Sequence, residues 1–316
     1  MRRFFVFALF AIFHSVSGIA KEVYEGEYEP LYAGTLLSFY PTNVDPGDIS
    51  VQPYIFAGSN YGVYNSDSSF ESLKNIDSLN FLLALETGVT KIFDITLIMN
   101  ALGTKYGSKH SLHFGDMNLY GGFQISKNKK DSWIPDCRLL IGETFPTGKF
   151  QKLNPDKAGS DVSGFGSFAT SFVSVVRKIF YTYPHPISIN LNLLYVVYSK
   201  VKIDGFSVYG GGEGTKGTVA PGNQFIANLG LEFSIDKFWE LGLDVRYIYA
   251  NKSRFSGKEI SGVVAGLPSS ELLSLAPCLE YNFNENFSVA IGAWFSVFGR
   301  NSVAFASGVA NVFYYF

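Results

Sequence analysis

The chain has 316 residues, of which 47% are hydrophobic and 16% aromatic, including 30 Phe and 19 Tyr. Charged residues make up only 16% of the sequence, below the roughly 25% of soluble domains, yet the mean hydropathy is only slightly positive. This combination excludes a helical membrane bundle and suits a wall whose residues alternate between lipid and water. The net charge of −2 gives no reason to expect binding to nucleic acid.

The N-terminus has the pattern of a signal peptide. Arg2 and Arg3 precede an apolar run over 4–13, and small residues follow over 15–20. Gly18 and Ala20 occupy the −3 and −1 positions of a cleavage site after Ala20. The apolar run is too short to cross about 30 Å of hydrocarbon, so we predict that 1–20 is a cleaved export signal.

Residues 21–47 differ from everything that follows them. They are acidic at first, with Glu22, Glu25, Glu27 and Glu29, and rich in turn residues near Pro46. We interpret 21–47 as a periplasmic N-terminal segment that forms a tail or a partial plug.

From about residue 48 onward the sequence alternates between apolar and polar positions, in segments of about 10 to 15 residues. In 241–249, for example, the odd positions are all apolar or aromatic, whereas Asp244 and Arg246 occupy even positions. The segments are long enough to cross a bilayer when tilted and exceed the usual strands of soluble sheets. We predict strands at about 48–58, 78–88, 91–101, 113–125, 134–145, 163–176, 187–199, 222–234, 239–250, 271–283, 287–298 and 303–316. The predicted fold is all-β: a transmembrane antiparallel up-and-down barrel of about twelve strands over 48–316.

The connections between these segments also follow a pattern. Short connections follow the even strands, and longer ones, at about 59–77, 102–112, 146–162, 200–221 and 251–270, follow most odd strands. Short periplasmic turns and long outer loops are typical of outer-membrane barrels. Aromatic residues gather near the predicted strand ends, where the membrane interface would lie. This pattern predicts the outer membrane of a Gram-negative-type bacterium as the location, with outer-membrane lipid around the wall.

The last strand ends in an aromatic residue. Counting back by two from Phe316 gives Tyr314, Val312 and Ala310, none of them charged. This ending resembles the signal that the outer-membrane assembly machinery recognises, so we predict Tyr314 and Phe316 as an assembly signal and that machinery as a partner.

The alternation assigns a set of charged residues to the lumen, because a Lys or Arg facing lipid near the midplane costs about 2–4 kcal/mol. Carboxylates outnumber arginines in this set, which favours cations or neutral solutes over anions. The alternative is an internal network of ion pairs that only stiffens the barrel. The pore-lining candidates are Glu86, Asp94, Asp116, Arg138, Glu232, Asp244, Arg246 and Glu280.

Little in the sequence indicates catalysis. Beside Asp116, a site could be imagined around His110, Ser111 and His113, but two histidines make an incomplete metal site. Cys137 and Cys278 are predicted to face opposite sides of the wall, where they cannot form a disulfide bond. We therefore predict no enzyme activity, no metal and no cofactor.

Five segments resemble the "MetA-pathway of phenol degradation" outer-membrane family. They are DPGDISVQPY at 45–54, LETGVTKIFDIT at 85–96, HFGDMNLYGGF at 113–123, GETFPTG at 142–148 and WELGLDVRY at 239–247. The resemblance implies a transporter-like barrel for the uptake of aromatic or other apolar compounds, and it carries over no site residue. The glycine-rich stretch at 200–221 departs from the family pattern and leaves the choice of solute open.

Three functions remain open at this stage. The first is a channel or transporter for a small, aromatic or apolar solute. The second is a structural or surface-exposed barrel whose outer loops bind partners, and the third is an outer-membrane hydrolase. The sequence does not indicate the oligomeric state.

Overall fold

The computed structural model describes residues 28–130, 132–258, 260 and 264–316. The predicted signal peptide at 1–20 lies outside the described residues. Over the described part of the chain, no helix has the length and apolar character needed to cross a membrane.

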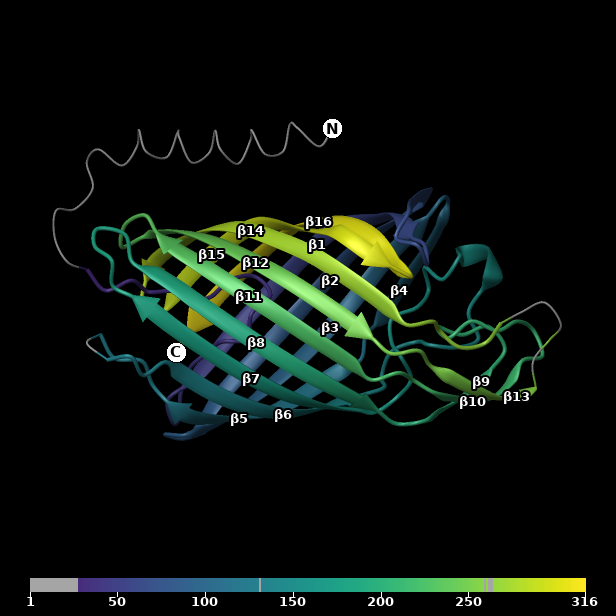
Figure 1. Ribbon diagram of the computed structural model, residues 1–316, viewed down its shortest axis with the longest axis horizontal. Coiled ribbons are helices and arrows are strands. Elements are labelled where there is room, and N and C mark those ends of the chain that lie inside the picture. Colours follow the sequence, from purple (N-terminus) through teal and green to yellow (C-terminus); the bar gives the residue numbers. More distant parts are fainter. Residues whose placement is uncertain (1–27, 131, 259, 261–263) are drawn as a thin grey trace.

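The described chain forms an antiparallel β-barrel (Figure 1). β4 and β5 both pair with β3 and share one place in the wall, so the thirteen strands of the sheet occupy twelve positions. The last strand pairs with the first, from Ser50 opposite Tyr315 to Tyr64 opposite Ser302, which closes the sheet on itself. The wall strands are β1 (Ile49–Tyr64), β2 (Phe70–Thr90), β3 (Phe93–Tyr106), β4 (Lys109–Phe114), β5 (Met117–Ser126), β6 (Asp136–Phe145), β7 (Ala169–Phe180), β8 (Ile187–Tyr198), β11 (Gln224–Ser234), β12 (Trp239–Ala250), β14 (Ser270–Asn284), β15 (Phe287–Arg300) and β16 (Ser302–Tyr315). The predicted fold class is confirmed.

Side chains alternate between the inner and outer faces of the wall along the strands, as the sequence predicts. In β8, Ser188, Asn190 and Asn192 are buried inside, whereas Ile189 and Leu191 are exposed outside. The same alternation turns Cys137 outward and buries Cys278 inside, and both thiols are free. Because polar residues line the interior and apolar residues cover the outer wall, the barrel suits a lipid surround and a lumen that holds polar groups.

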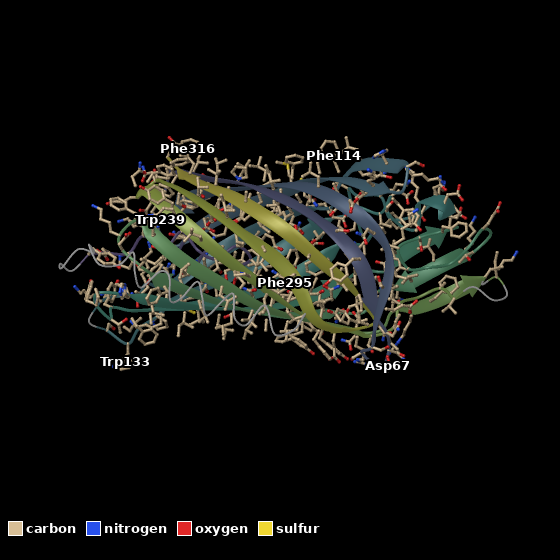
Figure 2. The ribbon with its side chains drawn as sticks, turned by 90° about the horizontal axis from the view of Figure 1, so that it is seen from above. Asp67, Phe114, Trp133, Trp239, Phe295 and Phe316 are labelled. Carbon is tan, nitrogen blue, oxygen red and sulfur yellow. The ribbon has the colours of Figure 1, made fainter. Side chains whose placement is uncertain are left out.

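Large apolar side chains cover the outside of the wall. Ile141 is 54% exposed and Ile291 64% exposed, although both lie within strands. Trp133, Trp239 and Phe316 project from the end of the barrel that carries the short turns, and Asp67 lies at the opposite end (Figure 2). Aromatic side chains at the ends of membrane strands typically lie at the depth of the lipid headgroups.

The two ends of the barrel differ in their connections. At the short-turn end, β2 and β3 are joined through Lys91 and Ile92, and β11 and β12 through 235–238. At the loop end, 146–168 contains the 3-10 helix η2 (Pro155–Lys157), and two other loops supply a separate sheet of β9 (Val201–Asp204), β10 (Lys216–Ala220) and β13 (Arg254–Lys258).

Two predicted long loops are wrong. The expected loop at 59–77 is an extension of β1 and β2 that turns at 65–69, and the one at 102–112 is a hairpin of β3 and β4. In β2 the side chains at 70–75 are exposed on both faces, so the apolar alternation disappears there, whereas β4 keeps an alternation that exposes Leu112 and Phe114.

Residues 28–47, here called the lumen segment, run through the inside of the barrel and become exposed at 45–47, just before β1. Tyr32 is completely buried and Leu36 is 4% exposed. Leu36 packs against Cys278 and Ala290 on the inner face of the wall. The segment therefore fills part of the lumen before the chain enters β1.

Candidate solute site in the barrel lumen

The path of the lumen segment follows from its hydrogen bonds to the wall. At the short-turn end the Tyr28 hydroxyl lies 2.9 Å from the Ser234 hydroxyl. Further along, the Leu37 N–H donates to Asp244, near the middle of β12. The Asn43 side chain then donates to the carbonyl of Lys91, back at the short turns. The segment thus enters the lumen, reverses near its middle and leaves by the same end.

Carboxylates on neighbouring strands hold the first bend of the segment. The Tyr32 N–H donates to Glu240 at 3.1 Å, and the next N–H, of Ala33, donates to Glu280 at 3.3 Å. Glu240 and Glu280 lie directly opposite each other on β12 and β14, a pairing of like charges that is unfavourable by itself. Successive N–H groups in a tight bend form an anion-binding concavity, so the bend offsets this repulsion. Gly34 has a φ of 104°, which favours glycine at this bend.

Asp244 holds the inner end of the segment. Its carboxylate accepts hydrogen bonds from the hydroxyls of Thr35 at 2.6 Å and Ser38 at 3.0 Å, and from the Leu37 N–H at 3.0 Å. The side-chain amide of Asn228, on β11, adds a fourth at 2.7 Å. Asp244 is completely buried, and a buried carboxylate depends on such donors.

Arg138 anchors the other limb of the segment. Its Nη2 lies 2.7 Å from Glu86 and 2.5 Å from Asp94, and its Nη1 donates to the Tyr40 carbonyl at 2.8 Å. Only 1% of the Arg138 side chain is exposed. Two carboxylates and a carbonyl therefore engage this guanidinium.

On the loop side of the lumen segment the barrel encloses a cavity of about 670 Å³. Its floor is formed by 36–40 of the segment, and its wall reaches Gln224 and Tyr198 near the loop ends of their strands. A space of this size falls within the range of small-molecule sites.

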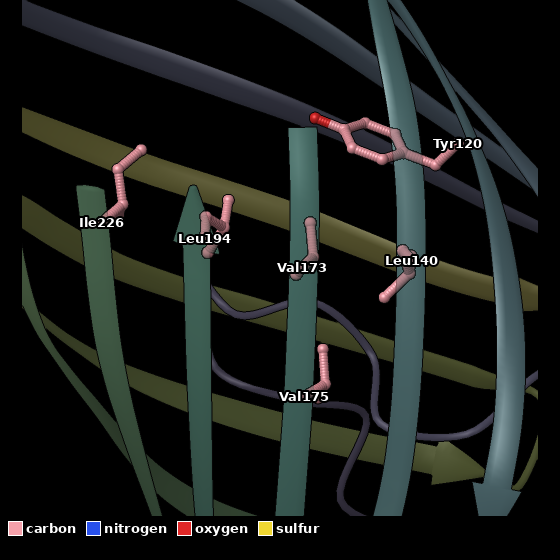
Figure 3. Close-up of a cluster of buried hydrophobic side chains, with 6 residues drawn as sticks. All are labelled: Tyr120, Leu140, Val173, Val175, Leu194 and Ile226. Carbon is pink, nitrogen blue, oxygen red and sulfur yellow. The ribbon is translucent and has the colours of Figure 1, made fainter. Parts of the chain in front are cut away.

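Aromatic and aliphatic side chains line about half of the cavity, and polar side chains such as Asn60, Asn80 and Asn118 line the rest. Phe39 of the segment packs edge-on against Tyr120, with ring centroids 5.3 Å apart. Across the lumen, Phe56 stacks on Tyr54 and meets the edge of Trp294. A buried cluster continues this apolar surface over β5 to β11 (Figure 3). It consists of Tyr120, Leu140, Val173, Val175, Leu194 and Ile226, of which Tyr120, Leu194 and Ile226 line the cavity.

The eight predicted lumen residues fall into four groups. Glu86, Arg138 and Arg246 line the cavity, and Asp94 completes the ion pairs of Arg138. Glu232 is buried beside the lumen segment, and Asp244 and Glu280 bind it. Asp116 lies at the foot of the 146–168 loop, where it accepts from the N–H groups of Gly148 and Phe165.

This distribution removes the basis for expecting cation preference. Three wall carboxylates, Glu240, Asp244 and Glu280, bind the lumen segment, and Glu86, on the cavity wall, is paired with Arg138. The count of carboxylates in the sequence therefore does not describe the charge that a solute in the cavity meets.

Some residues of the lumen and cavity were not predicted from the sequence. Glu240, 2% exposed, sits two positions before Gly242 on the inner face of β12, so the alternation already contained the signal for it. The aromatic floor and wall, at Phe39, Phe56 and Trp294, could not be told from lipid-facing rings by residue type alone.

At the imagined hydrolase site, Ser111, Asp116 and the His110 carbonyl make other contacts. The Ser111 hydroxyl accepts from Lys157 at 2.9 Å, and the same amine donates to the His110 carbonyl. Asp116 accepts from backbone N–H groups of the loop. Over the described residues, therefore, no hydrogen bond links Ser111, a histidine and Asp116 as a nucleophilic site requires.

The C-terminal residues lie on the outside of the wall at the short-turn end. Tyr314 and Phe316 are 44% and 56% exposed, and their ring centroids are 5.4 Å apart. The N–H and carbonyl of Phe316 pair with Ile49, which carries the closure of the barrel to its last residue.

Comparisons with known proteins show the fold. No family model and no curated protein matches the chain. Among solved structures, the chain is similar to the COG4313 outer membrane channel from Pseudomonas putida F1, with a TM-score of 0.67 and 11% identity, over 88% of this chain and 99% of that one. The TodX deltaS2S3 mutant monoaromatic hydrocarbon channel aligns with a TM-score of 0.41 and 11% identity, over 94% and 98%. The transport unit of the autotransporter AIDA-I from Escherichia coli aligns with a TM-score of 0.46 and 12% identity, over 90% and 93%. The chain has the fold of an outer-membrane β-barrel.

Proposed function

We propose that this protein is a passive outer-membrane channel for small aromatic or apolar solutes. The observation that carries the proposal is the 670 Å³ cavity inside a closed barrel, walled by Phe39, Tyr54, Phe56, Tyr120 and Trp294. Apolar side chains that face the lumen contact no lipid. An apolar solute that binds against them removes apolar surface of both from water, which is favourable. The similarity to a structure described as an outer membrane channel supports the same function.

In this proposal the short turns face the periplasm and the loops face outward. The signal peptide at 1–20 directs export, and Tyr314 and Phe316 present the assembly signal. Solutes enter from the loop end and bind on the loop side of the lumen segment. They leave when the segment shifts, because 36–40 form the floor of the cavity.

Intact cells provide the test, because a lipopolysaccharide leaflet slows apolar compounds that cross simple phospholipid bilayers freely. The readout is the rate at which N-phenyl-1-naphthylamine, which fluoresces in apolar surroundings, enters cells that make the protein. Ala84→Trp places a ring in the cavity, and Leu83→Trp places the same ring one residue away, on the outer face.

We expect the chain to accelerate uptake, Ala84→Trp to abolish the gain and Leu83→Trp to retain it. Equal uptake by both variants, or no gain over cells without the protein, would remove the channel function.

A second candidate is a surface barrel that binds partners through its loops. The separate sheet of β9, β10 and β13 favours it, because the loop end is itself a structured surface. This candidate predicts that trimming 200–221 removes binding to the partner while solute uptake is unchanged.

A further inference from the structure

One cation on the cavity wall lacks a counter-ion. Arg246, on β12, lines the cavity, and its Nη1 donates one long hydrogen bond, 3.4 Å, to the Leu37 carbonyl. Its Nε is buried and has no hydrogen-bond partner. Within the described residues, no carboxylate lies within 4.0 Å of its guanidinium.

Asp244 attracts Arg246 electrostatically, but the nearby acids that the structure describes form no direct ion pair with its guanidinium. Asp244 shares the inner face of β12 with Arg246, but its oxygens accept from Thr35, Leu37 and other donors. Glu86 is paired with Arg138. Both arginines leave a buried Nε without a partner, but Arg138 is held in direct ion pairs, whereas Arg246 has none among the described residues and keeps its donors for a ligand.

Arg246 lies between two polar residues, Asn228 on β11 and Ser274 on β14, with aromatic rings close by. Ser274 lies opposite Arg246 on β14, and its hydroxyl accepts from the Trp294 indole at 3.0 Å, which fixes the indole beside this position. Phe56 meets the edge of Trp294, and Phe39 lies on the floor. An aromatic wall next to an unpaired guanidinium matches a ligand with one apolar body and one anionic end.

We propose that the cavity selects aromatic monocarboxylates, with the carboxylate on Arg246 and the ring against Phe39, Phe56 and Trp294. This inference rests on the proposed function, because it takes the cavity as the solute site. A guanidinium offers a planar fork of donors that fits a carboxylate bidentately. A neutral solute of the same shape leaves the buried charge unpaired, which is unfavourable.

The test is a binding measurement on the refolded full-length barrel, with tryptophan fluorescence as the readout. The probes are 3-phenylpropionate and 3-phenylpropanol, which share a ring and chain and differ in charge. Trp294 lines the cavity, whereas Trp133 and Trp239 lie outside it, so Trp294→Phe must remove the signal. The variants are Arg246→Gln, Arg246→Lys and the control Arg254→Gln, in the exposed sheet beyond the barrel.

We expect the carboxylate to bind at least tenfold more tightly than the alcohol, because a hydrogen bond to a charged group commonly contributes that much. Arg246→Gln should abolish the preference, Arg246→Lys should retain part of it, and Arg254→Gln should leave it unchanged. Equal affinity for both probes, or a preference that survives Arg246→Gln, would overturn the inference. Because binding is measured without transport, a carboxylate preference in a protein that fails the uptake test would support this site and remove only the channel.

Discussion

Replacement of Asp244 by alanine should free the lumen segment while leaving the barrel closed. Three donors of the segment, Thr35, Leu37 and Ser38, converge on this carboxylate. The two hydroxyls lie 2.8 Å apart and can bond each other, but the Leu37 N–H loses its acceptor.

The size of the effect follows from these contacts. A hydrogen bond to a charged group contributes about 1.5–3 kcal/mol. Three such bonds to one carboxylate are not additive, so together they contribute less than three separate bonds would. We therefore expect docking of the segment to weaken by about 2–4 kcal/mol, or roughly 30- to 1000-fold in the ratio of docked to undocked states.

Single-channel recording in planar bilayers measures this ratio as the fraction of time spent in the open state. Asp244→Ala should open far more often than the natural chain, and Asp244→Asn, which keeps one acceptor oxygen, should lie between them. Asp77→Ala removes an exposed aspartate at the loop end of β2 and serves as the control. An unchanged open fraction in Asp244→Ala, with the barrel shown intact by its gel shift on heating, would refute the assignment of Asp244 as the main anchor.

Three further predictions concern the wall and the loops. Arg138→Leu leaves two buried carboxylates without their cation, so we expect a loss of about 3–5 kcal/mol in the free energy of unfolding. Denaturant titration in bilayers measures this loss. A change below about 1 kcal/mol would contradict the prediction. Ile141→Arg places a charge on the lipid face and should cost about 2–4 kcal/mol in the same assay, whereas the same change at Ser72, exposed beyond the membrane, should be nearly neutral. Burial alone would raise the pKa of Asp161, but the hydrogen bonds from Lys149 and the Asn154 N–H hold it below the usual value of 3.8. Because the folded pKa is lowered, this contact stabilises the 146–168 loop at neutral pH and the stabilisation is lost as the pH falls below about 3.8. Protease cleavage in this loop should therefore rise at acid pH, and Asp161→Asn should be sensitive already at neutral pH; a loop equally resistant in that variant would refute the role of Asp161.

The wall could be predicted from the sequence because each side chain of a membrane-spanning strand faces either lipid or the lumen. That constraint produces the period of two, which predicts that Asp244 and Arg246 face the lumen. The extension of β1 and β2 over 59–77 could not be predicted, because β2 is exposed on both faces there, as at Glu71 and Lys74, and neither face has to be apolar.

The interior was harder to predict, because the groups that decide it leave no side-chain pattern. The lumen segment is held largely by its own N–H groups, at Tyr32, Ala33 and Leu37, and every residue except proline has one. The inner acids were recognised, but their partners were not, so they appeared as a charged pore lining. In the structure Asp244 and Glu280 hold a segment in place, and aromatic rings form one part of the cavity on its loop side.

Reversible tethering of the lumen segment asks whether solutes pass only when the segment moves. Leu36 packs against Cys278 on β14, so Leu36→Cys in a Cys137→Ser background creates a pair that can join the segment to the wall. We predict that oxidation of this pair abolishes the accelerated uptake of N-phenyl-1-naphthylamine and that reduction restores it in the same cells. Uptake that is identical in the oxidised and reduced states, with the bond shown to have formed, would contradict the account, because solutes would then pass without any movement of the lumen segment.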